Sequence, residues 1–138
     1  MTSTIHEAAR EVEVVHETDV LVVGSGPGGF SAALAAARAG AQTTLLDRYG
    51  CFGGNMTQVG VESIGWYRHE RTIEANGIGR ELEDRALAMG AAAPESQSIS
   101  QGINGERFKY VADVLWQLEG PTLQGNKQWM SGRAAHTR

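Results

Sequence analysis

The chain has 138 residues and a formal net charge of −4 at pH 7, and 41% of its residues are hydrophobic. This length suits one domain, which is long enough for a hydrophobic core but small for an enzyme that holds both a dinucleotide and a substrate. The sequence has no run of basic residues, so its charge argues against nucleic acid as a partner.

Cysteine content and targeting signals narrow the class further. The single cysteine, Cys51, excludes an internal disulfide. No basic segment followed by an apolar core opens the chain, and no apolar stretch approaches membrane-spanning length. We therefore expect a cytoplasmic protein that has no membrane partner.

Residues 1–18 are polar and charged, and we interpret them as an N-terminal extension. The first predicted strand follows at residues 20–23. Its sequence, VLVV, is short and rich in β-branched residues, which is typical of a strand that is buried on both faces.

A glycine-rich turn comes directly after this strand. It fits the pattern G-x-G-x-x-G with the run Gly24-Ser25-Gly26-Pro27-Gly28-Gly29. In this pattern the first glycine permits a sharp turn, the second lets a pyrophosphate approach the backbone, and the third lets a helix pack close to the strand. The alanine-rich residues 30–39 then predict a helix, which should end at a left-handed Gly40. Its N-terminus would offer N–H groups to phosphates.

A second predicted strand, residues 41–46, ends at Asp47. This carboxylate stands near the spacing expected for a group that accepts hydrogen bonds from ribose hydroxyls. The order strand, glycine turn, helix, strand and acid therefore predicts a βαβ dinucleotide-binding unit. FAD and NAD both have a ribose that suits Asp47, so this residue by itself does not distinguish the two cofactors.

A glycine-interrupted loop follows the second strand. Its pair Gly53-Gly54 allows backbone conformations that are closed to other residues and lets the backbone approach a ligand. Asn55 and Thr57 could form hydrogen bonds there. The loop follows the carboxyl end of a strand, which favours a ligand contact over a plain surface turn. Cys51 lies in this loop without a second cysteine, so dithiol chemistry is excluded and a small, partly buried apolar role is the default.

The rest of the chain shows two helical patterns and no further convincing strand. Apolar residues at helical spacing predict amphipathic helices at residues 79–89 and 106–119. Residues 91–105 contain serine, glycine and proline and are predicted as a loop. Residues 120–138 contain no acidic residue and no periodicity, and we expect a disordered or truncated tail. The predicted domain, residues 19–119, is thus α/β but incomplete, with a βαβ unit and two further helices.

Residues 19–119 resemble the FAD-dependent oxidoreductases with a glutathione-reductase-like FAD domain, in the branch without a redox-active cysteine pair. The resemblance is carried by the turn at residues 24–29, by Asp47-Arg48 at the end of the second strand and by the loop at residues 53–57. It implies a Rossmann-like FAD/NAD(P)-binding fold, FAD as cofactor and a small organic molecule as substrate. The candidate cofactor-binding residues are Gly24, Ser25, Gly26, Pro27, Gly28, Gly29, Asp47, Arg48, Gly53, Gly54, Asn55 and Thr57.

The leading hypothesis is the N-terminal FAD-binding segment of an oxidoreductase, in which the flavin transfers hydride or electrons. A fragment of an NAD-dependent dehydrogenase is the first alternative. A catalytically inactive, truncated dinucleotide-binding module is the second. The sequence indicates no catalytic residue, no metal site and no oligomeric state.

Overall fold

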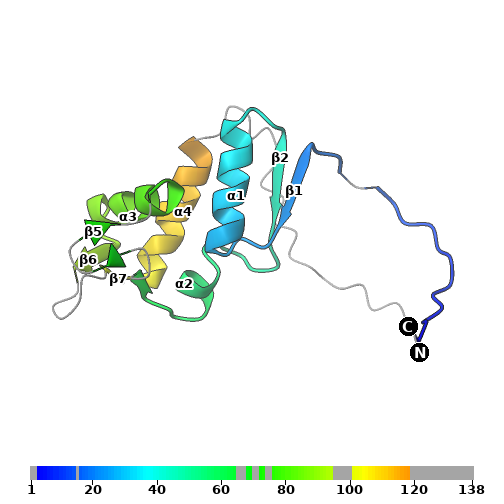
Figure 1. Ribbon diagram of the computed structural model, residues 1–138, viewed down its shortest axis with the longest axis horizontal. Helices are drawn as coiled ribbons and strands as arrows, with labels where there is room; N and C mark the ends of the chain where they lie inside the picture. The colour runs from blue at the N-terminus through cyan, green and yellow to red at the C-terminus, as the bar shows by residue number, and fades with distance from the viewer. Residues whose placement is uncertain are drawn as a thin grey trace.

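The computed structural model describes residues 3–14, 16–64, 68–69, 72–73, 76–94 and 101–118. In these residues the chain is α/β, as predicted, and helix α1 lies between a parallel strand pair and the other helices (Figure 1). The helices are α1 (Pro27–Arg38), α2 (Asn55–Gln58), α3 (Ile78–Ala88) and α4 (Gly105–Leu118). The strands are β1 (Val20–Val23), β2 (Thr43–Leu46), β3 (Ser63–Ile64), β4 (Arg68–His69), β5 (Thr72–Ile73), β6 (Ala92–Pro94) and β7 (Gln101–Ile103).

The first three elements form the predicted strand–helix–strand unit. Strands β1 and β2 pair in parallel, with Val20 opposite Thr43, and α1 packs against both strands. Helix α1 begins at Pro27, three residues earlier than predicted, because the fixed φ of proline suits the first helical position. It ends before Gly40, whose φ of 89° is left-handed as expected.

Strand β1 is only partly buried on one face and is exposed on the other, which corrects the prediction of two buried faces. Its side chains alternate, and Leu21 and Val23 are 58% and 73% exposed. A run of β-branched residues does not reveal whether both faces are covered, because cover depends on elements far away in the sequence. Among the described residues, α1 packs against the other face of the pair.

The segment predicted as a loop at residues 91–105 contains strands β6 and β7, so the expectation of only two strands was wrong. These two strands join β3 in an antiparallel sheet of order β3-β7-β6, and β4 pairs with β5. Strands of two or three residues are too short to show a period of two in the sequence. Pro94 ends β6, an edge strand in which the missing N–H is tolerated.

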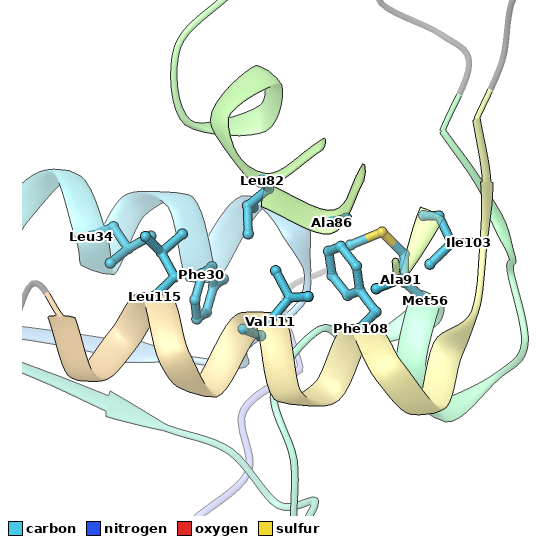
Figure 2. Close-up of a cluster of buried hydrophobic side chains, with 11 residues drawn as sticks. Phe30, Leu34, Met56, Leu82, Ala86, Ala91, Ile103, Phe108, Val111 and Leu115 are labelled. Atoms are coloured by element: carbon cyan, nitrogen blue, oxygen red, sulfur yellow. The ribbon is translucent and has the colours of Figure 1, made fainter. Parts of the chain in front are cut away.

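The two later helices occur within about one residue of their predicted bounds. On α4, Phe108, Val111 and Leu115 fall on one face, and each is at most 1% exposed. They belong to a buried apolar cluster shared by the four helices and the small antiparallel sheet (Figure 2). Its members are Phe30, Leu34, Met56, Leu82, Ala86, Ala91, Ile103, Phe108, Val111, Ala112 and Leu115.

The N-terminal extension carries no helix or strand in its described residues, 3–14 and 16–18. Its last residues contact β2 and the residue before that strand: His16 lies 3.0 Å from the Thr44 hydroxyl, and the Thr18 hydroxyl donates to the carbonyl of Gln42. No helix in the described part of the chain is both long and apolar enough to span a bilayer. The predicted tail, residues 120–138, lies outside the described residues.

Candidate functional site

An open cavity of about 460 Å³ lies at the carboxyl ends of β1 and β2. This volume is within the range of about 300–1,000 Å³ that is usual for small-molecule pockets. The cavity is lined by Val23, Gly24, Ser25, Gly26, Leu46, Asp47, Arg48, Tyr49 and Gly54. Half of the residues predicted to bind cofactor are thus brought together here, while Pro27, Gly28, Gly29, Gly53, Asn55 and Thr57 stay outside the lining.

The glycine turn, residues 24–29, places backbone where side chains would not fit. Gly24 has a φ of 98°, and its N–H donates to the carbonyl of Leu46, which ties the turn to β2. A β carbon at Gly29 would lie only 1.9 Å from the carbonyl oxygen of Gly24, so α1 can pack this close to the turn only because Gly29 has no side chain.

Gly26 is open on the side where a β carbon would stand. Such an atom would meet nothing within 4 Å, and the residue is extended, with φ −59° and ψ 172°. Directly after it, α1 begins at Pro27 and carries no acidic residue in its first turn. The first N–H groups of a helix have no carbonyl partner within it, and the helix dipole makes this end positive. The turn and α1 therefore form a surface that suits a phosphate.

Asp47 is held by the glycine turn. Its Oδ2 accepts hydrogen bonds from the N–H and the hydroxyl of Ser25, each at 2.5 Å, and Oδ1 accepts from the N–H of Tyr49 at 2.9 Å. Burial raises the pKa of Asp47, but hydrogen bonds from the Ser25 hydroxyl and from nearby backbone N–H groups outweigh burial, so the pKa lies below its ordinary value. The charged form thus stabilises the fold at pH values above the pKa of this carboxyl in the unfolded chain. This stabilisation is lost as the pH falls through the lower folded value.

Tyr49 is a pocket residue that the sequence analysis missed. The residue is 43% exposed, and the guanidinium carbon of Arg48 lies 4.7 Å from the centroid of its ring. Arg48 also donates a hydrogen bond of 2.6 Å to the phenol oxygen. The pair presents a flat, cationic surface beside Asp47, on which an aromatic ligand group could stack. In the sequence, the only signal for this surface was Arg48, the basic residue that follows Asp47.

The Gly53-Gly54 pair packs against the backbone of the glycine turn. The N–H of Gly53 donates to the carbonyl of Ser25 at 3.0 Å. Gly54 has a φ of 54°, and a β carbon there would lie 2.6 Å from the α carbon of Gly26. The pair is therefore more than a surface turn, because it packs on the backbone that a phosphate would approach.

The loop prediction was too long at its C-terminal end, because helix α2 begins at Asn55. Asn55 is exposed on this helix. Thr57 is only 8% exposed, and its hydroxyl donates to the carbonyl of Phe52 at 2.8 Å. Because this hydrogen bond uses the hydroxyl proton of Thr57 within the loop, the side chain stabilises the loop conformation.

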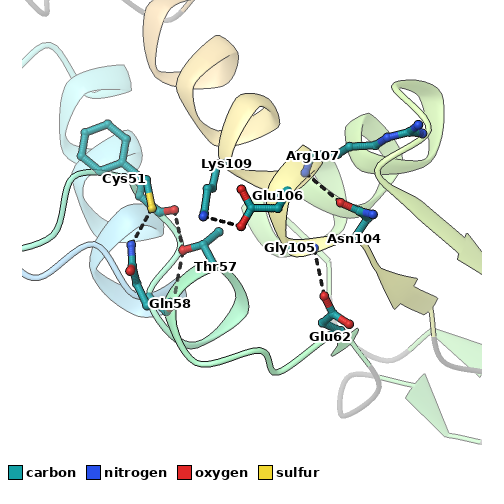
Figure 3. A network of polar contacts seen from close by, with 11 residues as sticks. Cys51, Thr57, Gln58, Glu62, Asn104, Gly105, Glu106, Arg107 and Lys109 are labelled. Carbon is teal, nitrogen blue, oxygen red and sulfur yellow. Dashed lines mark hydrogen bonds and ion pairs between the residues drawn. The ribbon is translucent and has the colours of Figure 1, made fainter.

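Polar contacts lie around the loop and α2 and around the start of α4 (Figure 3). Gln58 donates to the sulfur of Cys51 at 2.5 Å, and the N–H of Gly105 donates to Glu62. A β carbon at Gly105 would lie 2.9 Å from the carbonyl oxygen of Met56, so α4 starts directly against α2. The loop that supports the glycine turn is thereby anchored to the core.

Comparison with known proteins gives the family. The sequence profile described as FAD dependent oxidoreductase matches residues 19–133. Sarcosine oxidase subunit alpha of Corynebacterium sp. (strain U-96) is 49% identical over 131 residues, which cover 88% of this chain and 13% of the relative. Leghemoglobin reductase of Vigna unguiculata is 46% identical over 116 residues, which cover 84% of this chain and 21% of the relative.

A third relative belongs to the glutathione-reductase-like flavoproteins. The mitochondrial dihydrolipoyl dehydrogenase of Pisum sativum is 31% identical over 99 residues, which cover 64% of this chain and 20% of the relative. The chain spans 13% of the length of the sarcosine oxidase subunit and about a fifth of the length of the other two relatives. No solved structure matches it. Because the profile covers most of the sequence, the chain belongs to the FAD dependent oxidoreductase family, whose cofactor is FAD.

Proposed function

We propose that residues 19–119 are the start of a Rossmann-like FAD-binding domain and that the cavity beside β1 and β2 receives the ADP half of FAD. The proposal is carried by one observation: Gly26, which is open to a ligand, stands directly before the positive end of α1. A pyrophosphate there would meet backbone N–H groups without a side chain in between.

The ribose and the adenine of the cofactor would also meet side chains of suitable chemistry in this cavity. Asp47 lines the same cavity as Gly26 and offers a charged acceptor to ribose hydroxyls. The Arg48–Tyr49 pair lines it too and offers a stacking surface for adenine. Both are fixed by hydrogen bonds within the chain, so little ordering is needed when a ligand binds.

We further propose that the protein takes part in oxidation or reduction of a small organic molecule. The bound flavin would supply the hydride or electron chemistry, and this chain would bind and orient the cofactor. We assign no catalytic acid or base. A dinucleotide-binding module without catalysis is the second candidate. The exposed face of β1 at Leu21 and Val23 favours it, because the described elements leave this face of the strand–helix–strand unit uncovered.

Parallel calorimetric titrations of the chain with FAD, NAD and ADP test the proposal. FAD should bind, ADP should compete with it, and NAD should bind more weakly. FAD should also raise the free energy of unfolding, by about 2.7 kcal/mol at a free concentration of 100 Kd. Tighter binding of NAD than FAD would favour the dehydrogenase alternative, and a cooperatively folded chain that ignores FAD would contradict the proposal.

A further inference from the structure

Ser25 stands at a position of the glycine turn where the G-x-G-x-x-G pattern leaves the residue type open. The residue is 0% exposed. Both its hydroxyl and its own N–H donate to one oxygen, Oδ2 of Asp47, each at 2.5 Å. A buried hydroxyl that is committed to a carboxylate cannot also donate to a ligand, so its effect on a ligand must pass through Asp47.

These two hydrogen bonds make the two carboxylate oxygens of Asp47 different, because both go to Oδ2. A carboxylate oxygen accepts about two hydrogen bonds, so Ser25 fills the capacity of Oδ2. Oδ1 accepts from the N–H of Tyr49 at 2.9 Å, and the backbone N–H of Arg48 also acts on this carboxylate. Oδ1 is the oxygen to which Ser25 donates no hydrogen bond, so it is the one that a ribose hydroxyl can approach. With Oδ2 fixed to the turn, the carboxylate is also prevented from rotating about its terminal bond.

We propose that Ser25 is a positioning residue of the cofactor site, whose hydroxyl holds Oδ2 of Asp47 so that Oδ1 meets the ribose of FAD. This inference rests on the proposed function, because it takes FAD as the ligand. The hydroxyl has a second effect, since it is among the hydrogen bonds that lower the pKa of Asp47 against the opposing effect of burial. Ser25 thereby keeps the carboxylate both oriented and charged.

The test compares Ser25→Ala, which removes the hydroxyl, with Ser25→Thr, which keeps it. Ser31→Ala is the matched control, because Ser31 is a partly buried serine on α1 that does not line the cavity. Two quantities are measured in the full chain: the pKa of Asp47 by carbon-detected NMR without ligand, and the Kd for FAD by calorimetry. Ser25→Ala should raise the pKa of Asp47 and raise the Kd for FAD about tenfold, the effect of one lost hydrogen bond. Ser25→Thr should reverse most of both changes, and Ser31→Ala should cause neither.

The two readouts separate this inference from the proposed function. If the wild-type chain does not bind FAD, the proposed function fails, while the NMR titration still decides whether Ser25 holds Asp47. An unchanged pKa in Ser25→Ala overturns the inference. A raised pKa with an unchanged Kd overturns the positioning role.

A second measurement does not require Ser25→Ala to fold. In the wild-type chain, the buried Ser25 hydroxyl proton should exchange slowly with water and should change its NMR frequency as Asp47 titrates. A hydroxyl proton that exchanges rapidly with water, or whose NMR frequency stays constant while Asp47 titrates, contradicts the inference.

Discussion

Replacement of Gly29 by alanine should destabilise the chain by about 3 kcal/mol or more, which is a large share of the roughly 5–15 kcal/mol by which ordinary domains are stable. The added β carbon would lie 1.9 Å from the carbonyl oxygen of Gly24 and 3.5 Å from the side chain of Val22. The first contact is with backbone, which cannot move aside as a flexible side chain does. Helix α1 must therefore shift away from β1, and the core residues Phe30 and Leu34 must shift with it.

The matched control is Gly28→Ala, one residue earlier on the same turn of α1. Gly28 is exposed, and a β carbon there meets nothing within 4 Å. Alanine favours a helix over glycine by up to about 1 kcal/mol, so this variant should be as stable as wild type or slightly more stable. Urea unfolding followed by circular dichroism measures both variants. Equal midpoints for Gly29→Ala and wild type would show that α1 does not pack on the turn as described.

Replacement of Gly54 by alanine should weaken FAD binding about ten- to hundredfold, the effect of one lost charge-assisted hydrogen bond to a phosphate. The added β carbon would lie 2.6 Å from the α carbon of Gly26. Because Gly53 also bonds the carbonyl of Ser25, the displaced loop has to move the glycine turn with it. The change acts on a ligand through the backbone of the turn.

Gly60→Ala is the control that separates the clash from backbone strain. Gly60 also has a positive φ, of 73°, but a β carbon there meets nothing within 4 Å. Both variants should lose stability, by about 1–3 kcal/mol for the strained backbone conformation. Only Gly54→Ala should raise the Kd for FAD in calorimetric titration. A similar loss of affinity in Gly60→Ala would mean that strain alone explains the result, and the support role of Gly54 would be wrong.

The local part of the site could be predicted from the sequence. The strand, the glycine turn, helix α1, the second strand and Asp47 are successive in the chain, and each has a signal in residue type or spacing. The structure has all of them in the predicted order. The amphipathic helices α3 and α4 were equally accessible, because more than two helical turns repeat the same apolar spacing.

The contacts that complete the site could not be predicted, because they join segments that are distant in the sequence. Nothing near Gly54 indicates that it packs on Gly26, and nothing near Ser25 indicates a bond to Asp47. The exposed face of β1 was missed for the same reason, since cover is decided by other elements. Strands β6 and β7 were missed because they are too short to show a pattern.

A phosphate of FAD should approach the backbone at Gly26, and a calorimetric FAD titration of Gly26→Val tests this placement most directly. The extended backbone of Gly26 and the open space around it allow valine, and a residue before proline prefers this conformation. The variant should therefore unfold at the urea concentration of wild type, yet bind FAD at least about a hundredfold more weakly, because several charge-assisted hydrogen bonds are lost. A folded Gly26→Val chain that binds FAD with the affinity of wild type would contradict the account.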